Sequence, residues 1–161
     1  MLFLLLTVDG KRYALESQKV VEVLPLVFLE TLPHSPKYIP GIFNYRGQIV
    51  PVIDLCQLMR DKPCCEHFST RIILIKHYDN GSENSSQSPK HSIFGLIAER
   101  VTDTLQKSET ELMDANIQID AAPYLDKIIV QDAEMIQCIH LDYLLSKVER
   151  VHFYQKLNYD N

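Results

Sequence analysis

The sequence lacks the short motifs by which many enzymes of this size are recognised. It contains no GxGxxG or GxxxxGK[ST] phosphate loop, no GxSxG nucleophile turn and no HExxH zinc helix. Its six histidines are scattered, and none lies four residues from another. Acid–base catalysis would require a carboxyl group with a shifted pKa in a cleft, and nothing in the sequence predicts one. We therefore expect a protein that is not an enzyme.

An excess of positive charge is also missing. Lysine and arginine together number 16 against 21 aspartates and glutamates, which gives a net charge of −5. Nucleic-acid-binding proteins usually carry a basic face, and anionic lipids attract clusters of basic residues. Arginine and aromatic residues are not interleaved as they are in β-barrels that bind single strands. The sequence therefore argues against nucleic acid as a partner and against a β-barrel of that class.

Long hydrophobic runs are absent as well. No apolar stretch approaches the roughly 18 to 20 residues that cross a bilayer. Residues 1–8 are mostly apolar, but no basic segment precedes them and the polar residues 9–12 follow at once. A secretory signal peptide has a basic start and a longer apolar core. We interpret residues 1–8 as a buried strand and expect a cytoplasmic protein with no direct membrane insertion.

The four cysteines, Cys56, Cys64, Cys65 and Cys138, contain no CxxC pair. Cys64, Cys65 and His67 are close enough in sequence to suggest a metal site. Zinc, however, takes four tetrahedral ligands, and vicinal cysteines rarely both reach one ion. A chain of this size also buries enough surface to fold without a disulfide. We expect free thiols, no metal and no cofactor.

One alternative belongs to a different functional class. Cys138 and His140 are two residues apart, so on a strand their side chains would lie on the same face. A small cytoplasmic cysteine-dependent enzyme could use such a pair. Both residues lie within an apolar run, which favours packing in the core. No catalytic residue is therefore expected.

What the chain does contain is a series of short apolar runs. The apolar share is 46%, which is normal for one packed globular domain. Residues 3–8 and 13–16 flank Asp9-Gly10, a pair that readily adopts the positive φ angles of a two-residue hairpin turn. Further strands are expected at residues 19–24 (or a short helical entry there), 48–53, 71–76, 93–98, 127–131 and 135–140, the last two as a second hairpin.

Helices are few and short in this interpretation. Asp54 is placed to cap a short helix, and Leu141 begins an apolar stripe with helical spacing. Residues 110–115 predict one helical turn. The polar residues 79–91 predict a flexible linker at a hairpin tip. Together these patterns predict a mainly β protein, either a barrel or a sandwich.

The most distinctive segment is residues 38–55, YIPGIFNYRGQIVPVIDL. Gly41 and Gly47 permit a positive φ or a close backbone approach. Asn44 can bond to its own backbone two residues on. Arg46 stands at a turn, where its planar guanidinium is free to meet a carboxylate or a carbonyl. These properties alone indicate a structural turn, and a partner contact by Arg46 is the alternative.

This segment resembles the signature of the CheW family of chemotaxis adaptor domains, in which an NxRG turn precedes a PVIDL strand. Residues 13–15 and 20–23 upstream, and residues 94–97, 101–103 and 124–125 downstream, are similar to further parts of the family pattern. The resemblance covers about residues 2–148. Glu99 departs from it, because the family commonly has aspartate there, and the segment 79–91 is longer than the usual hairpin.

The resemblance implies a fold of two SH3-like five-stranded β-barrel subdomains with short helices. It places them in a single domain of residues 1–150, followed by a tail of residues 151–161. It also implies a non-enzymatic coupler. Its partners would be the regulatory domain of a CheA-like histidine kinase and the cytoplasmic tip of a chemoreceptor, in arrays at the inner face of the membrane.

The same resemblance assigns partner-binding residues. In the family a groove between the barrels takes the helical hairpin of the receptor, and the matching positions here are Val20, Gly41, Ile72, Val101 and Thr104. The positions tied to other partner contacts are Glu22, Asn44 and Arg46, with Gly47 completing the turn.

Overall fold

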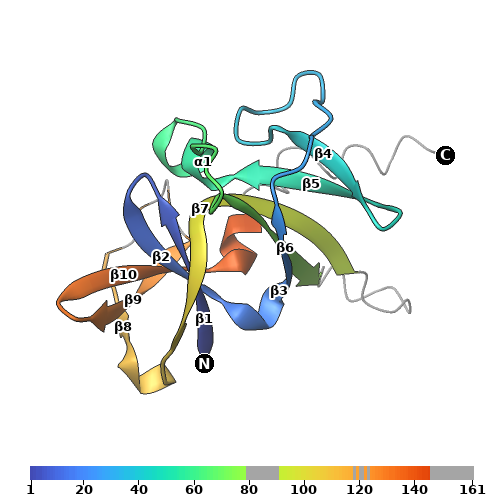
Figure 1. Ribbon diagram of the computed structural model, residues 1–161. Helices are drawn as coiled ribbons and strands as arrows, with labels where there is room; N and C mark the ends of the chain where they lie inside the picture. Colours follow the sequence, from blue (N-terminus) through green and yellow to red (C-terminus); the bar gives the residue numbers. More distant parts are fainter. Residues whose placement is uncertain (79–90, 118, 120–121, 123, 146–161) are drawn as a thin grey trace.

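The fold is mainly β and is built from ten strands and short helical pieces (Figure 1). The structure, a computed structural model, describes residues 1–78, 91–117, 119, 122 and 124–145. Its elements in chain order are β1 (Leu2–Val8), β2 (Lys11–Glu16), the 3-10 turn η1 (Ser17–Lys19), β3 (Val20–Pro25), β4 (Gly41–Tyr45), β5 (Gln48–Asp54), α1 (Leu55–Arg60), β6 (Arg71–Tyr78), β7 (His91–Gln106), the 3-10 turn η2 (Glu109–Glu111), β8 (Leu112–Asp114), β9 (Leu125–Gln131) and β10 (Glu134–Ile139). Residues 141–145 are also helical.

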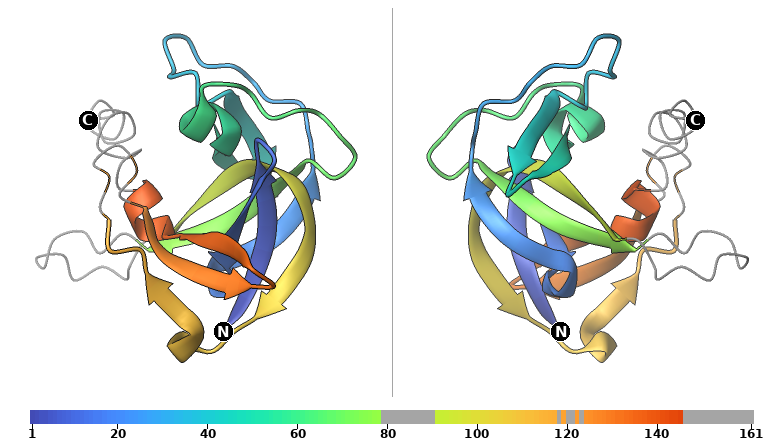
Figure 2. Two further views of the ribbon diagram at one scale, coloured as in Figure 1. Left: turned by 90° about the vertical axis from the view of Figure 1, so that its left-hand side faces the viewer. Right: turned by 90° about the vertical axis from the view of Figure 1, so that its right-hand side faces the viewer.

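The strands fall into two groups that share the long strand β7. In group 1 the order is β3-β6-β7-β5-β4, and the first half of β7 pairs antiparallel with β6 and parallel with β5. In group 2 the order is β7-β1-β2-β10-β9-β8, and the second half of β7 pairs with β1. Figure 2 shows α1, β4 and β5 at one end of the molecule and β8, β9 and β10 at the other. Their description as SH3-like barrels stays a prediction.

The core lies between the two groups and within each of them. The largest buried cluster joins group 2 residues such as Leu6 and Tyr13 to group 1 residues such as Ile73 and Leu96. Smaller clusters lie within group 1 and within group 2. Strand β6 is buried on both faces, because alternate residues contribute to different clusters. Its continuous apolar sequence, RIILIK, is typical of such a strand.

Several expected elements are confirmed. Asp9 and Gly10, with φ of 50° and 78°, form the turn between β1 and β2. The strands β6 and β7 pair as a hairpin, as do β9 and β10. The Asp54 side chain caps α1 by accepting a hydrogen bond from the backbone N–H of Gln57. Residues 79–90 and 146–161, which include most of the predicted linker and the tail, lie outside the described residues.

Two sequence predictions are wrong. Cys56 and Cys64 form a disulfide bond, which leaves Cys65 and Cys138 as the cysteines outside it. The helical turn predicted at residues 110–115 is limited to η2, and strand β8 follows it because residues 112–114 pair with β9.

Among the described residues, no helix is long and apolar enough to span a membrane.

Candidate interaction surface

The turn between β4 and β5 presents the single arginine of the signature segment, Arg46. Arg46 and Gly47 occupy the two turn positions, with φ of 50° and 86°. Two positive φ angles are what a type I′ hairpin turn requires, and they match the twist of the flanking strands. The Asn44 side chain locks the turn, because its Oδ1 accepts a hydrogen bond of 2.8 Å from the backbone N–H of Gly47. The expected turn is therefore confirmed, and it projects Arg46 outward.

The Arg46 side chain is 78% exposed and yet is held in place on two sides. Its guanidinium carbon lies 5.1 Å from the centre of the Tyr45 ring, within the range of a cation–π contact. One of its nitrogens lies 3.8 Å from Oε2 of Glu22 on β3. The Tyr45 hydroxyl donates a hydrogen bond to that same oxygen. Glu22, Tyr45 and Arg46 therefore form a linked triad at the surface, named the turn triad below.

The electrostatics of the turn triad centre on Glu22. Its hydrogen bond to the Tyr45 hydroxyl raises the pKa of Tyr45 above its usual value, because the bond favours the protonated phenol. The positive charge of Arg46 acts in the opposite direction on the same hydroxyl. Since the Glu22 contact of Arg46 is long and exposed, much of the guanidinium's hydrogen-bonding capacity remains available to another molecule.

An apolar side chain accompanies the turn triad. Ile49 on β5 pairs across the hairpin with Asn44, and 59% of its surface is exposed. The hairpin end thus combines a positively charged fork, a carboxylate, an aromatic ring and an exposed aliphatic group. Such a mixture is typical of a protein-binding surface.

The other predicted partner residues lie in three different settings. Val20 is half-buried on β3, and Thr104 is exposed on the half of β7 that belongs to group 2. Ile72 and Val101 are buried, with 0% and 7% of their surface exposed. Gly41 is buried where a Cβ atom would lie 2.4 Å from the carbonyl oxygen of Glu30. The structure therefore brings Glu22, Asn44, Arg46 and Gly47 together at the surface, whereas Gly41, Ile72 and Val101 are buried.

Sequence reasoning missed Tyr45, which connects Glu22 to Arg46. The sequence shows an aromatic residue next to the turn, but a strand residue has two faces. Only the position of β3 beside the hairpin end decides that this ring meets Glu22.

The pair Cys138 and His140 lines a pocket of about 200 Å³ whose wall also includes Phe3, Lys19 and Leu141. The Cys138 side chain is 8% exposed and packs in a cluster with Phe3, Leu5, Ala14, Ile129 and Ile136. The His140 ring is exposed and stacks on Tyr143, with 4.4 Å between ring centres. These surroundings favour the packing role for Cys138.

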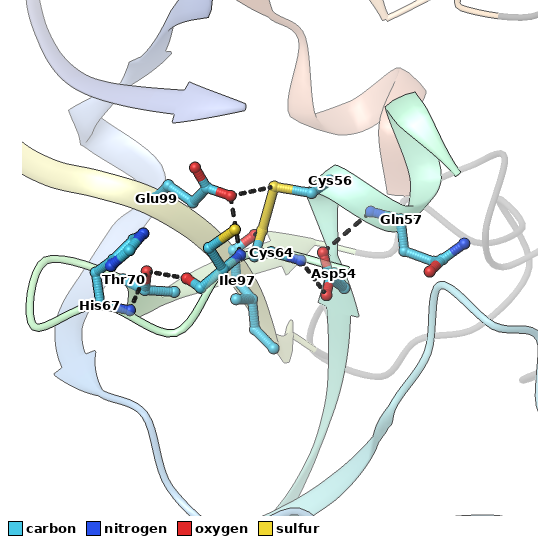
Figure 3. The surroundings of a disulfide bond; sticks show 9 residues. Asp54, Cys56, Gln57, Cys64, His67, Thr70, Ile97 and Glu99 are labelled. Atoms are coloured by element: carbon cyan, nitrogen blue, oxygen red, sulfur yellow. Dashed lines mark hydrogen bonds between the residues drawn. A yellow bond between two sulfur atoms is a disulfide. The ribbon is translucent and has the colours of Figure 1, made fainter. Parts of the chain in front are cut away.

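A second group of polar side chains gathers at the opposite end of β5 (Figure 3). We call it the disulfide corner; it comprises Asp54, Cys56, Cys64 and Glu99. Asp54 and Cys56 are buried, and Cys64 and Glu99 are partly buried. Asp54 accepts hydrogen bonds from the backbone N–H groups of Gln57 and Cys64, both at 3.1 Å. Burial nevertheless raises the pKa of Asp54.

The set considered from sequence, Cys64, Cys65 and His67, is not the group that the structure brings together. Cys65 and His67 are exposed, and the Thr70 hydroxyl bonds to the backbone of both. Among the described residues, the side chains close enough to share a metal ion are those of Asp54, Cys56 and Cys64. The sequence spacing of Cys56 and Cys64 did not predict this group, because the spacing matches no common metal-ligand pattern.

An exposed, preorganised arginine turn on a mainly β scaffold is typical of protein-interaction modules. The sequence profile of the CheW-like domain matches residues 2–149, and the chain therefore belongs to the CheW-like family. The chain is 27% identical to the chemotaxis protein CheW of Bacillus subtilis over 142 residues, which are 87% of this chain and 83% of that protein. It is 23% identical to a probable chemotaxis protein CheW of Rhizobium etli over 88% of this chain and 85% of that protein.

A solved structure agrees with this assignment. The scaffolding protein TtCheW from Thermoanaerobacter tengcongensis superimposes with a TM-score of 0.70 at 26% identity, covering 86% of this chain and 82% of that protein. The mainly β fold and the family assignment predicted from the signature segment are therefore confirmed.

Proposed function

We propose that this protein is a non-enzymatic adaptor that couples chemoreceptors to a CheA-like histidine kinase. The observation that carries the proposal is the match to the CheW-like domain along residues 2–149, in a chain whose relatives are chemotaxis and scaffolding proteins. The protein acts as one CheW-like domain of residues 1–150. It is cytoplasmic and is recruited to receptor arrays by its partners.

The turn triad forms part of one partner surface. Arginine is enriched among residues that dominate binding energy, because its planar fork makes several directed hydrogen bonds at once. Here the rigid turn and the Tyr45 ring fix the guanidinium before any partner arrives. Little side-chain entropy is therefore lost on binding. Asn44 and Gly47 contribute by fixing the turn, and Glu22 by holding the hydroxyl of Tyr45.

The receptor surface is a separate part of the proposal. Val20 and Thr104 offer exposed or half-exposed area to a helical hairpin of the receptor. Ile72 and Val101 are buried, and their packing holds in place the strands that carry the receptor surface. Gly41 keeps β4 close to Glu30, which a larger residue would push away. A helix that packs into an apolar groove needs no polar chemistry.

A reconstitution with purified parts tests the proposal. A receptor cytoplasmic fragment and the regulatory domain of the kinase from the same organism are titrated separately onto the immobilised adaptor. Binding of both is expected. Arg46→Ala should weaken one interaction roughly 30-fold, which corresponds to about 2 kcal/mol. Arg46→Lys should recover only part of it, because lysine lacks the planar fork.

Arg60→Ala is the matched control, since Arg60 is exposed at the end of α1 and distant in sequence from the turn. Its affinities should equal those of the parent protein. Failure of the parent protein to bind either partner would refute the adaptor function. Equal affinities for Arg46→Ala and Arg60→Ala would refute only the role of Arg46.

A further inference from the structure

The disulfide corner has the composition of a metal site as well as that of a crosslink. One carboxylate oxygen of Asp54 and the sulfur atoms of Cys56 and Cys64 all lie within 4.8 Å of one another. They come from the last residue of β5, the second residue of α1 and the segment that follows α1. Oε1 of Glu99, on β7, lies 3.5 Å from Sγ of Cys56. The corner thus brings two sulfurs and the carboxylate of Asp54 within reach of a single ion, with the carboxylate of Glu99 beside Cys56 (Figure 3).

The carboxylate charge at this corner is met by backbone N–H groups and, among the described residues, by no salt bridge to a basic side chain. The charged side chain that acts on Asp54 is Glu99, which is itself negative. Partly or fully buried acidic groups are normally paired with a cation or coordinate a metal, because burial alone is costly. The negative charge of the corner therefore favours the binding of a positive ion.

The ligand types suit zinc in particular. Zinc binds sulfur at about 2.3 Å and carboxylate oxygen at about 2.0 Å in a tetrahedral arrangement, which places a sulfur and an oxygen ligand about 3.5 Å apart. The three ligand atoms of the corner lie within 4.8 Å of one another, and reduction of the disulfide frees the two sulfurs to take up this spacing. Two thiolates and one carboxylate also carry enough negative charge to bind a divalent ion. Calcium and magnesium are disfavoured, because they prefer oxygen ligands alone.

We propose that the chain binds one zinc ion at the disulfide corner when the Cys56–Cys64 bond is reduced, with Cys56, Cys64 and Asp54 as ligands and a water molecule at the fourth position. Reduction by a dithiol transfers two electrons and two protons to the pair, so the protein gains two thiols and the reductant becomes a disulfide. Zinc binding then releases the two thiol protons as the thiolates coordinate. The corner thus holds a covalent crosslink when oxidised and a metal crosslink when reduced and loaded with zinc.

The surroundings are already arranged to support such a site. The backbone N–H groups of Gln57 and Cys64 donate to the two oxygens of Asp54, and that of Cys65 donates to Glu99 at 3.0 Å. Each oxygen of Asp54 retains a further lone pair for the metal. Hydrogen bonds of this kind orient ligands and are typical of the outer shell of metal sites. Asp54 and Cys64 also line a pocket of about 370 Å³, which gives an ion access from solvent.

The test uses the full chain and zinc itself. The protein is reduced with a phosphine, freed of reductant without oxygen, and titrated with Zn²⁺ against a chromophoric chelator. One equivalent per chain is expected for the parent protein and for the matched controls Cys65→Ser and Cys138→Ser. Cobalt substitution should give thiolate charge-transfer bands and the spectrum of a tetrahedral ion. The oxidised protein should bind no zinc.

Variants assign the ligands. Cys56→Ser and Cys64→Ser should abolish binding of the one zinc equivalent, and Asp54→Asn should weaken zinc binding at least tenfold. Asparagine still accepts hydrogen bonds at a helix N-cap, so Asp54→Asn keeps the cap of α1. An unchanged affinity in Asp54→Asn would refute Asp54 as a ligand.

A measurement on the parent protein keeps the proposal testable if a variant fails to fold. Zinc should protect Cys56 and Cys64 of the reduced protein from alkylation and leave Cys65 reactive, as read by mass spectrometry. Equal labelling with and without zinc would refute the site. Equal zinc binding by the oxidised protein would refute it as well.

Discussion

The two ends of strand β5 are built by opposite means. At its start, the turn of Arg46 and Gly47 depends on neighbours in sequence, namely the side chain of Asn44 and the ring of Tyr45. At its end, the disulfide corner depends on residues as far along the chain as Glu99. The first end is exposed and offers its polar groups to other molecules. The second is largely buried and uses its polar groups within the fold. One strand therefore connects the proposed partner surface to a largely buried group of polar side chains.

The largest effect is expected from Gly41, at the N-terminal end of β4. A Cβ atom there would meet the carbonyl of Glu30 at 2.4 Å, and backbone atoms cannot move aside as a side chain would. Gly41→Ala should lower the free energy of unfolding by about 3 kcal/mol. For a chain of this length, thermal melting should fall by roughly 6 to 12 °C. Gly10→Asn is the control, because Gly10 has a φ of 78° and open space. Equal melting of the two variants would contradict the crowding argument.

A smaller loss is expected at the disulfide corner. Asp54→Ala removes the cap of α1 and leaves the backbone N–H of Cys64 without its acceptor. We expect a loss of about 2 kcal/mol in the oxidised, metal-free protein, measured by urea unfolding. Asp54→Asn should lose less than half as much, since its amide oxygen still accepts one of these bonds. If both variants unfold at the same urea concentration, the hydrogen bonds are not what makes Asp54 important.

Arg46→Ala should change stability very little, in contrast to its effect on binding. Its contact with Glu22 is 3.8 Å long and exposed, and such ion pairs contribute between 0 and about 1 kcal/mol. The melting temperature should therefore fall by no more than roughly 2 to 4 °C. A fall as large as that of Gly41→Ala would show that the guanidinium holds the hairpin together.

The smallest expected effect is a change in the pKa of Tyr45. The hydrogen bond to Glu22 raises that pKa in the folded protein, so the folded state holds its phenol proton to higher pH than the unfolded chain. The hydrogen bond therefore stabilises the folded protein at pH values below the Tyr45 pKa of the unfolded chain. This stabilisation is lost as pH rises through the Tyr45 pKa of the folded protein. Glu22→Gln should lower the Tyr45 pKa toward its usual value. Ultraviolet absorbance of tyrosinate against pH, with Tyr45→Phe as the reference, measures the shift. An unchanged pKa in Glu22→Gln would mean that the triad bond is absent in solution.

The same contrast explains what the sequence could predict. Features that depend on neighbouring residues could be predicted from residue types alone. These are the turns at Asp9-Gly10 and Arg46-Gly47 and the helix cap at Asp54. The resemblance to the CheW family supplied the family assignment, which strand spacing alone could not; the two SH3-like barrels that it implies stay a prediction.

The errors have one physical cause, the action of distant segments. Residues 112–114 were assigned to a helical turn, but pairing with β9 overrides local preference. The thiols of Cys56 and Cys64 were expected to be free, because seven intervening residues of irregular composition do not reveal that the chain folds back over α1. Tyr45 was overlooked for the same reason, since its partner comes from β3.

The parallel pairing of β10 with β2 has a consequence for how the chain is made. Strand β2 leaves the ribosome early, and its partner follows roughly 120 residues later. At the usual pace of synthesis this is a wait of roughly 6 to 24 s. During that time the apolar hairpin of β1 and β2 has an open edge, and such edges attract other unfinished chains. Slower elongation in the second half of the chain should therefore increase aggregation of nascent protein, and a chaperone that covers the first 16 residues should reduce it.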